Sequence, residues 1–206
     1  MHPTTQQLTD QVSIQSNQLI QKPESYTLIG KGRSAFVFKD EQTGYAIKIF
    51  FTEFEHLAKQ EADIYTKLEG SPYYPEVYEV GHNYIVMEYI EGHTFYDCLH
   101  KGIRITKEMI DEVDKALAYA RSKGLNPSDI HLQNLILTHE GTIKVIDVVR
   151  FKQVKACTQW DDLKFAHERF YERKYFMKKV PRTIIELVKL YYKKIVLPFR
   201  TLRSNK

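Results

Sequence analysis

The sequence predicts an α+β protein whose amino-terminal half is rich in strands and whose carboxy-terminal half is mostly helical. Short β-rich runs separated by glycine turns occupy much of the stretch from Tyr26 to Met87. Beyond residue 92, helix caps and apolar stripes with helical spacing dominate, interrupted by one predicted hairpin. With 206 residues, the chain is long enough for one domain of two lobes with a substantial buried core.

The composition is that of a globular protein, with 43% hydrophobic and 13% aromatic residues. The two cysteines, Cys98 and Cys157, form no disulfide or metal-binding pattern, so we interpret them as reduced thiols of an intracellular protein. The first residues lack the features of a signal peptide, and no apolar run approaches the ~20 residues that span a bilayer. We therefore expect a cytoplasmic protein.

The basic character is concentrated at the carboxy terminus. From Arg169 onward there are twelve Lys or Arg residues against Glu172 and Glu186, whereas residues 1–168 contain 18 basic and 24 acidic residues. A basic amphipathic helix is predicted from about Thr183 to Pro198. It either packs on the helical lobe or contacts an anionic membrane or nucleic acid, and membrane contact would make the protein peripheral.

The amino-terminal third combines a glycine loop, a buried cation and a buried acid. Residues 1–24 are polar and glutamine-rich and are predicted to be a flexible or loosely docked extension. Predicted strands flank GKGRSA, where Gly30 and Gly32 let the backbone approach a ligand. On the next strand, YAIKIFF, Lys48 shares a face with apolar residues, a costly arrangement for an unpaired cation. The alternative is an edge-strand lysine that extends to water.

The following helix offers a partner for this lysine. Thr52 and Glu55 are predicted to form a capping box that begins a helix ending near Leu68. Glu61 falls within the apolar stripe of that helix. A glutamate on a buried helix face after a lysine on an apolar strand predicts an internal ion pair between Lys48 and Glu61.

The stretch DIHLQNLILTHEGTIKVID holds a second group of polar residues. LILT and IKVID are predicted strands joined by a turn at Gly141. Asp129 and Asn134 would lie on the loop entering this hairpin and Asp147 at its exit. Two carboxylates and an amide brought together suit one oxygen-seeking cation and one alcohol proton.

Together these motifs resemble the protein kinase-like superfamily, most closely small bacterial serine/threonine protein kinases. The resemblance covers about residues 25–151, in the order GKGRSAFV, AIK, the helix glutamate, the Asp–Asn loop and the final Asp. It implies a two-lobed fold with a β-rich N-lobe at 25–87, a hinge and shortened helical C-lobe at 88–180, and a basic tail at 181–206.

The resemblance also implies site roles and cofactors. ATP and Mg²⁺ would be the cofactors, with Asp129 as the base that accepts the acceptor's proton and Asn134 and Asp147 as metal ligands. Lys48, positioned by Glu61, would hold the α- and β-phosphates, and IVMEYIEG would be the hinge beside adenine. The implied nucleotide-binding set comprises Gly30, Lys31, Gly32, Ala35, Val37, Ala46, Lys48, Glu61, Met87, Glu88 and Ile90.

Some residues depart from the protein kinase pattern. His131 replaces the lysine two positions after the catalytic aspartate, as in small-molecule kinases of the aminoglycoside phosphotransferase type, and it is assigned a catalytic role. Ser128 replaces the arginine before that aspartate, and only twelve residues separate Asp147 from Trp160.

The first hypothesis for the function is a serine/threonine protein kinase acting on a protein hydroxyl. The alternatives are a phosphotransferase acting on a small alcohol and a non-catalytic nucleotide-binding module.

Overall fold

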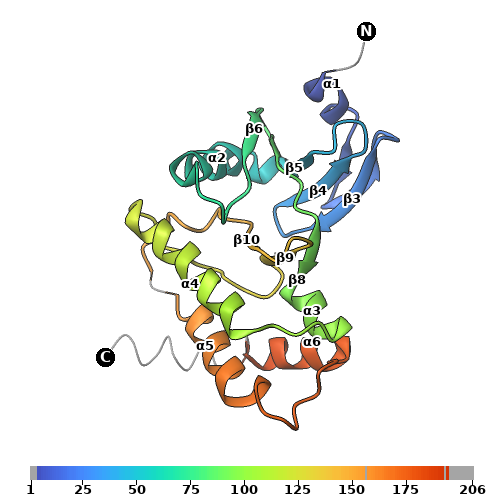
Figure 1. The fold of residues 1–206 in the computed structure, drawn as a ribbon. Coiled ribbons are helices and arrows are strands. Elements are labelled where there is room, and N and C mark those ends of the chain that lie inside the picture. Colours follow the sequence, from blue (N-terminus) through green and yellow to red (C-terminus); the bar gives the residue numbers. More distant parts are fainter. Residues whose placement is uncertain (1–3, 156, 193, 195–206) are drawn as a thin grey trace.

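A computed structural model describes residues 4–155, 157–192 and 194, which form two lobes (Figure 1). The N-lobe is built on a five-stranded antiparallel sheet in the order β3-β4-β5-β7-β6. As predicted, its strands alternate with turns along the sequence. Their bounds are β3 Tyr26–Lys31, β4 Ala35–Asp40, β5 Ala46–Phe50, β6 Val77–Val80 and β7 Tyr84–Met87.

The two faces of this sheet belong to two separate apolar clusters. Side chains alternate along β5, so Ala46 and Phe50 join the core that continues into the C-lobe. Ile47 and Ile49 join a second, outer cluster instead. All five residues of β5 are buried. Because side chains alternate, Lys48 lies on the same face as Ala46 and Phe50, which looks toward the other lobe.

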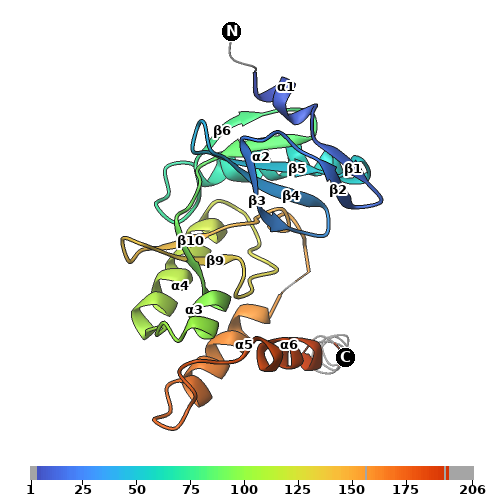
Figure 2. The same cartoon turned by 90° about the vertical axis from the view of Figure 1, so that its right-hand side faces the viewer.

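The amino-terminal segment covers the outer cluster. It forms α1 (Thr5–Thr9) and the hairpin of β1 (Ser13–Gln15) and β2 (Gln18–Gln21), which lie against the N-lobe (Figures 1 and 2). The sequence predicted a flexible or loosely docked extension here. Its few apolar side chains pack against the aromatic rings on the outer face of the sheet, because burial of these apolar surfaces is favourable. The covering side chains are Leu8, Val12, Ile14 and Leu19.

The helix of the N-lobe, α2, runs over His56–Leu68 and buries Glu61 completely. The predicted capping box of Thr52 and Glu55 was wrong. Thr52–Phe54 form a 3₁₀ turn, and Phe51 takes the extended backbone conformation expected of a cap residue. The helix therefore begins at His56 without a side-chain cap, while its end at Leu68 agrees with the prediction.

A small sheet lies between the N-lobe and the C-lobe helices (Figure 2). Its strands are β8 (Gly92–Thr94), β9 (Leu135–Thr138) and β10 (Ile143–Val145), all antiparallel. The hairpin of β9 and β10 was predicted, whereas β8 was not, because the exposed residues before it indicated only a linker. This sheet holds the loop before β9 and the segment after β10 beside the N-lobe.

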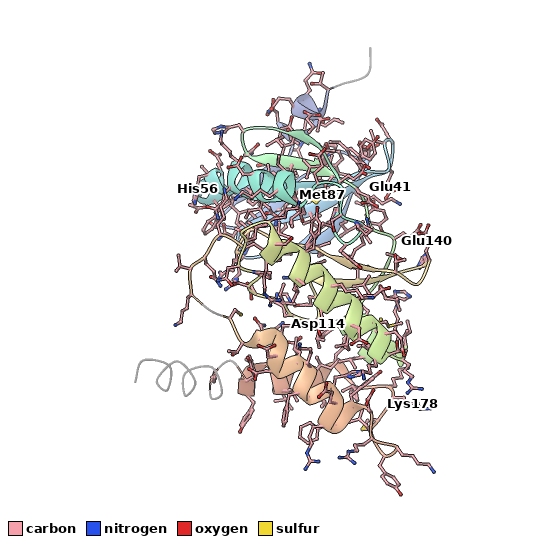
Figure 3. The ribbon with its side chains drawn as sticks, turned by 60° about the vertical axis from the view of Figure 1, so that its left-hand side comes forward. Glu41, His56, Met87, Asp114, Glu140 and Lys178 are labelled. Atoms are coloured by element: carbon pink, nitrogen blue, oxygen red, sulfur yellow. The ribbon has the colours of Figure 1, made fainter. Side chains whose placement is uncertain are left out.

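The rest of the C-lobe is helical. α3 (Phe95–Lys101) is capped by Thr94, and α4 (Lys107–Ser122) is capped by Thr106, both as predicted. α5 (Gln159–Ala166) continues into a π-helical turn, η2 (His167–Tyr171), and α6 spans Arg182–Tyr191. Asp114 on α4 accepts hydrogen bonds from Trp160 (2.7 Å) and Lys164 (3.0 Å) on α5 (Figure 3). These hydrogen bonds hold α5 against α4.

The predicted apolar stripe of the last helix is largely uncovered. Ile185 is buried, whereas Leu187 and Val188 are more than 60% exposed. Half of the predicted tail, residue 193 and residues 195–206, lies outside the described residues, so its partners stay a prediction. None of the described helices is both long and apolar enough to cross a membrane. The domain boundaries and the cytoplasmic location stay predictions as well.

Candidate active site

Lys48 is the centre of a three-residue charge network between the lobes. Its strand places it opposite Val37 on β4 and Ile85 on β7. Its ammonium lies 2.6 Å from Glu61 Oε2 and 2.9 Å from Asp147 Oδ1. The predicted ion pair with Glu61 is therefore confirmed, and the same lysine also reaches the aspartate at the exit of the hairpin.

The charges of this network depend on one another. Burial raises the pKa of Glu61 to about 7, although the charge of Lys48 opposes the rise. For Lys48, burial lowers the pKa, but Glu61 and Asp147 outweigh it and hold the pKa above its ordinary value. For Asp147, burial raises the pKa, but the charge and hydrogen bond of Lys48 bring it below its ordinary value. Lys48 is thus a cation and Asp147 an anion at neutral pH.

The loop before β9 is fixed by backbone and amide contacts. Asn134 donates from Nδ2 to the Asp129 carbonyl (3.1 Å), and its own carbonyl accepts from the Ile146 N–H (2.9 Å). The amide nitrogen of Asn134 is thereby engaged, and its Oδ1 is the atom suited to a cation. Asp129 and Asp147 have φ angles of 62° and 59°, in the left-handed region that only a few non-glycine residues adopt. Such strain is often found at functional sites.

Two arginines contact the predicted base, and the sequence analysis missed both. Arg33 Nη2 and Arg150 Nε each lie 3.2 Å from Asp129 Oδ2. Arg33 belongs to the glycine loop GKGRSA, so its place in that loop was the signal that could have identified it. Nothing in the local sequence marks Arg150, because its contact depends on how the segment after β10 folds back.

His131 lies half-buried on the same loop. Burial lowers its pKa, although the charges of Asp129 and Asp147 raise it and only partly compensate. The imidazole is therefore neutral at pH 7 and can donate one hydrogen bond, without the permanent charge of a lysine.

The predicted nucleotide-binding residues fall into two groups. Val37, Ala46 and Met87 share the Lys48 face of the sheet, since Val37 pairs with Lys48 and Ala46 pairs with Met87. Gly30 lies opposite Val37 on this face. Figure 3 labels Met87 where the N-lobe sheet meets the C-lobe. These residues can form one apolar surface beside the charged network. Ala35 is buried in the same core as Ala46 and Met87.

Other members of the predicted set have different surroundings. The ammonium of Lys31 lies over the ring of Phe36, 5.6 Å from its centroid, on the outer side of the sheet. Glu88 uses its carboxylate to bind Lys144 on β10 (3.0 Å), and its N–H donates to the Glu76 carbonyl (2.8 Å). This link between the lobes was not predicted. Gly32 is exposed in the loop, and Ile90 is half-buried just after Glu88.

The oxygen donors fit a magnesium–nucleotide complex. Mg²⁺ is commonly held by one or two carboxylates together with substrate phosphates, rather than by a complete protein cage. Asp147 and Asn134 supply one carboxylate and one amide oxygen. In the described part of the chain, no cluster of three His, Cys, Asp or Glu side chains forms a dedicated metal site. The residues therefore suit a metal that is shared with a phosphate ligand.

Comparison with known proteins agrees with this geometry. No family model matches the chain. The chain is 54% identical over 176 residues to the protein named "Putative serine/threonine-protein kinase YrzF" of Bacillus subtilis, covering 84% of this chain and 82% of that protein. The chain belongs to the serine/threonine protein kinase family. Its two-lobed kinase-like fold, with a β-rich N-lobe and a shortened helical C-lobe, is thereby confirmed.

Longer kinases of the same family match a smaller part of the chain. A Clostridium perfringens protein named "Probable serine/threonine-protein kinase CPE1738" is 33% identical over 148 residues, 63% of this chain and 22% of that protein. The Lactococcus lactis "Probable serine/threonine-protein kinase PknB" is 29% identical over 137 residues, 58% of this chain and 22% of that protein. The family supports kinase activity in general.

Proposed function

We propose that this protein is an ATP- and Mg²⁺-dependent serine/threonine protein kinase that transfers the γ-phosphate to a protein hydroxyl. The observation that supports this most strongly is the position of Lys48, which contacts both Glu61 and Asp147. A buried cation between a helix acid and a metal-type aspartate is the arrangement that phosphoryl transfer by kinases requires.

The roles divide between binding and positioning. Adenine would lie against Val37, Ala46 and Met87, along the segment from Glu88 to Ile90. Lys48 would hold the α- and β-phosphates, while backbone N–H groups of residues 30–35 would cover them. Asn134 and Asp147 would hold Mg²⁺, which supplies neutralisation of phosphate charge when bound.

The acceptor side of the reaction falls to Asp129 and His131. The Asp129 carboxylate accepts the proton of the acceptor hydroxyl as the oxygen attacks. Neutral His131, two residues further on, donates a hydrogen bond toward the transferred phosphoryl group. Phosphoryl transfer depends mainly on alignment and electrostatic stabilisation, so the fixed loop geometry around Asn134 is part of the catalytic apparatus.

A second candidate is a phosphotransferase of the same fold that acts on a small alcohol. His131 in place of the usual lysine supports it, and so does the short segment between Asp147 and Trp160. Family membership favours a protein acceptor. The two candidates differ only in the acceptor, so one assay can separate them.

The test is transfer of label from γ-labelled ATP, with a generic protein acceptor and with small alcohols, in the wild type and in Asp129→Asn. We expect Mg²⁺-dependent label on protein, reduced at least about 100-fold in the variant. Asp114→Asn is the matched control, because Asp114 joins α4 to α5 away from the site. ATP turnover only with small alcohols would support the second candidate, and nucleotide binding without transfer to any acceptor would refute both.

A further inference from the structure

Three cations from separate parts of the chain lie near Asp129 or His131. Arg33 comes from the loop between β3 and β4, Arg150 follows β10, and Lys189 lies on α6. Lys189 donates to Gln133 Oε1 on the catalytic loop (3.3 Å), which places it beside His131. The charges of Lys189 and Arg33 both act on His131 and lower its pKa. These three residues are called the acceptor-side cations below.

The two arginines leave room for an acceptor. Both contact Oδ2 of Asp129, so Oδ1 is the carboxylate oxygen that can receive the hydroxyl proton. The Arg33 side chain is 72% exposed and that of Arg150 is 48% exposed. Each guanidinium has five N–H donors, and the described residues give each of them this one carboxylate partner. Their remaining donors are therefore available to a ligand bound beside Asp129.

The cations near the acceptor position are only partly offset by carboxylates. Asp129 offsets one of the three cations, and Glu186 lies 3.7 Å from Lys189 and offsets another. Asp147 lies 2.9 Å from Lys48, and its charge also interacts with Arg150. The guanidinium groups of Arg33 and Arg150 are the exposed cations at Asp129. A substrate with cationic side chains next to its hydroxyl would be repelled, whereas carboxylates there would find donors with a geometry that matches them.

We infer that Arg33 and Arg150 are specificity-determining residues that select a serine or threonine flanked by acidic side chains. This inference rests on the proposed protein kinase function and adds the class of acceptor. Arg33 belongs to the glycine loop that would cover the nucleotide phosphates. It would therefore connect that loop with the bound acceptor. Lys189 extends the positive region along α6.

The test uses three peptides that differ only in the residues flanking one central serine, which are acidic, neutral amide or basic. We expect kcat/KM for the acidic peptide to exceed that for the neutral peptide by about tenfold and to be lowest for the basic peptide. Raising the salt concentration from about 0.05 M to about 0.5 M should reduce this preference, because screening weakens exposed charge pairs.

Variants identify the residues responsible. Arg33→Gln and Arg150→Gln should each lower the ratio of acidic to neutral peptide kcat/KM by about fivefold, and Arg33→Glu should favour the basic peptide. A purely structural role would lower both rates together and leave this ratio unchanged. Arg104→Gln is the matched control, because this exposed arginine lies on the far side of the C-lobe, beside Tyr171.

Three outcomes would overturn the inference, and each has a different meaning. Equal phosphorylation of all three peptides by the wild type would remove the acidic preference and leave the protein kinase function standing. If no peptide is phosphorylated while small alcohols are, the proposed function fails and the inference fails with it. A preference that persists unchanged in the Arg33→Gln, Arg150→Gln double variant would show that other residues select the substrate.

Discussion

Lys48 is a charged side chain that bears on both stability and the proposed chemistry. Its ammonium has two carboxylate partners in different surroundings, since Glu61 is fully buried and the Asp147 side chain is 44% exposed. A buried pair of this kind is weak evidence for net stability, but removal of one member is costly because the other is left buried without a partner. The arrangement holds an always-charged lysine at the place where phosphates would bind.

The variant Lys48→Met should lower phosphate transfer at least about 100-fold and make stability depend on pH. Without the lysine, burial of Glu61 is unopposed, so its folded-state pKa should rise further above the unfolded value near 4.5. A raised folded pKa contributes stability at pH values below the unfolded pKa, and this contribution is lost as pH rises through the folded pKa. Urea unfolding between about pH 5 and pH 8 should show the decline.

The double variant Lys48→Met, Glu61→Gln is the control for this prediction. It has no carboxyl group at position 61 to titrate, so the pH dependence should largely disappear although transfer stays low. A single variant whose stability does not change over this pH range would contradict the proposed burial of an uncompensated carboxyl group.

Asn134 provides a second prediction at the residue scale. Asn134→Ala removes the amide oxygen suited to Mg²⁺ and the hydrogen bond to Asp129, so about tenfold more Mg²⁺ should be needed for half-maximal activity. Asn126→Ala is the matched control, since Asn126 donates from its amide to the carbonyls of Gln153 (2.8 Å) and Lys155 (3.1 Å), in the segment after β10. An unchanged Mg²⁺ requirement in Asn134→Ala would rule out the ligand role.

At the scale of elements, the small β8–β9–β10 sheet determines where the loop with Asp129 lies. Gly92 pairs with Thr138, and a Cβ built on Gly92 would lie 2.2 Å from the Leu137 carbonyl oxygen. That obstacle is backbone, which cannot rotate away as a side chain can. The strand pair that supports the loop with Asp129 therefore depends on a residue without a side chain at position 92.

Gly92→Ala should destabilise the protein by about 2–3 kcal/mol, because the strands must separate to admit the methyl group. Denaturant unfolding would measure this. Gly32→Ala is the control for stability, since the nearest atom to its added Cβ lies at 3.4 Å, an ordinary contact distance. Equal stability of the two variants would mean that β8 is not held closely against β9.

At the scale of the whole molecule, α2 is tied directly to the segment that follows Asp147. Gln60 donates to the Val149 carbonyl (3.0 Å), and Asp63 pairs with Lys152 (3.2 Å). The segment that makes these contacts is short, with only twelve residues between Asp147 and Trp160. These contacts hold α2 in place in a position that many regulated kinases reach only after phosphorylation of a longer loop.

We therefore expect activity that does not require phosphorylation of the protein itself. Treatment with a phosphatase, followed by its removal, should leave the initial rate of transfer within about twofold of the untreated rate. Gln60→Ala should lower the rate even so, because it releases α2 from the Val149 carbonyl. Loss of activity on dephosphorylation would show that a modification is needed to complete the site.

The sequence by itself determined the features that arise from local patterns. Alternation along YAIKIFF separated the Lys48 face from the outer face, helical spacing placed Glu61 on a buried stripe, and the turn at Gly141 marked the hairpin beside Asp129. These patterns follow from strand and helix geometry, so a single sequence is enough to reveal them. The order of the motifs along the chain also carried the resemblance to the kinase-like fold and its charged centre.

The tertiary structure alone decided the contacts between segments that are distant in the chain. Residues 5–21 adopt secondary structure against the aromatic outer face of the sheet, although their own composition is polar. Arg33 and Arg150 meet at one oxygen of Asp129 from positions 96 residues before it and 21 residues after it. Such contacts depend on how the two lobes pack, and local composition or periodicity gives no information about that packing.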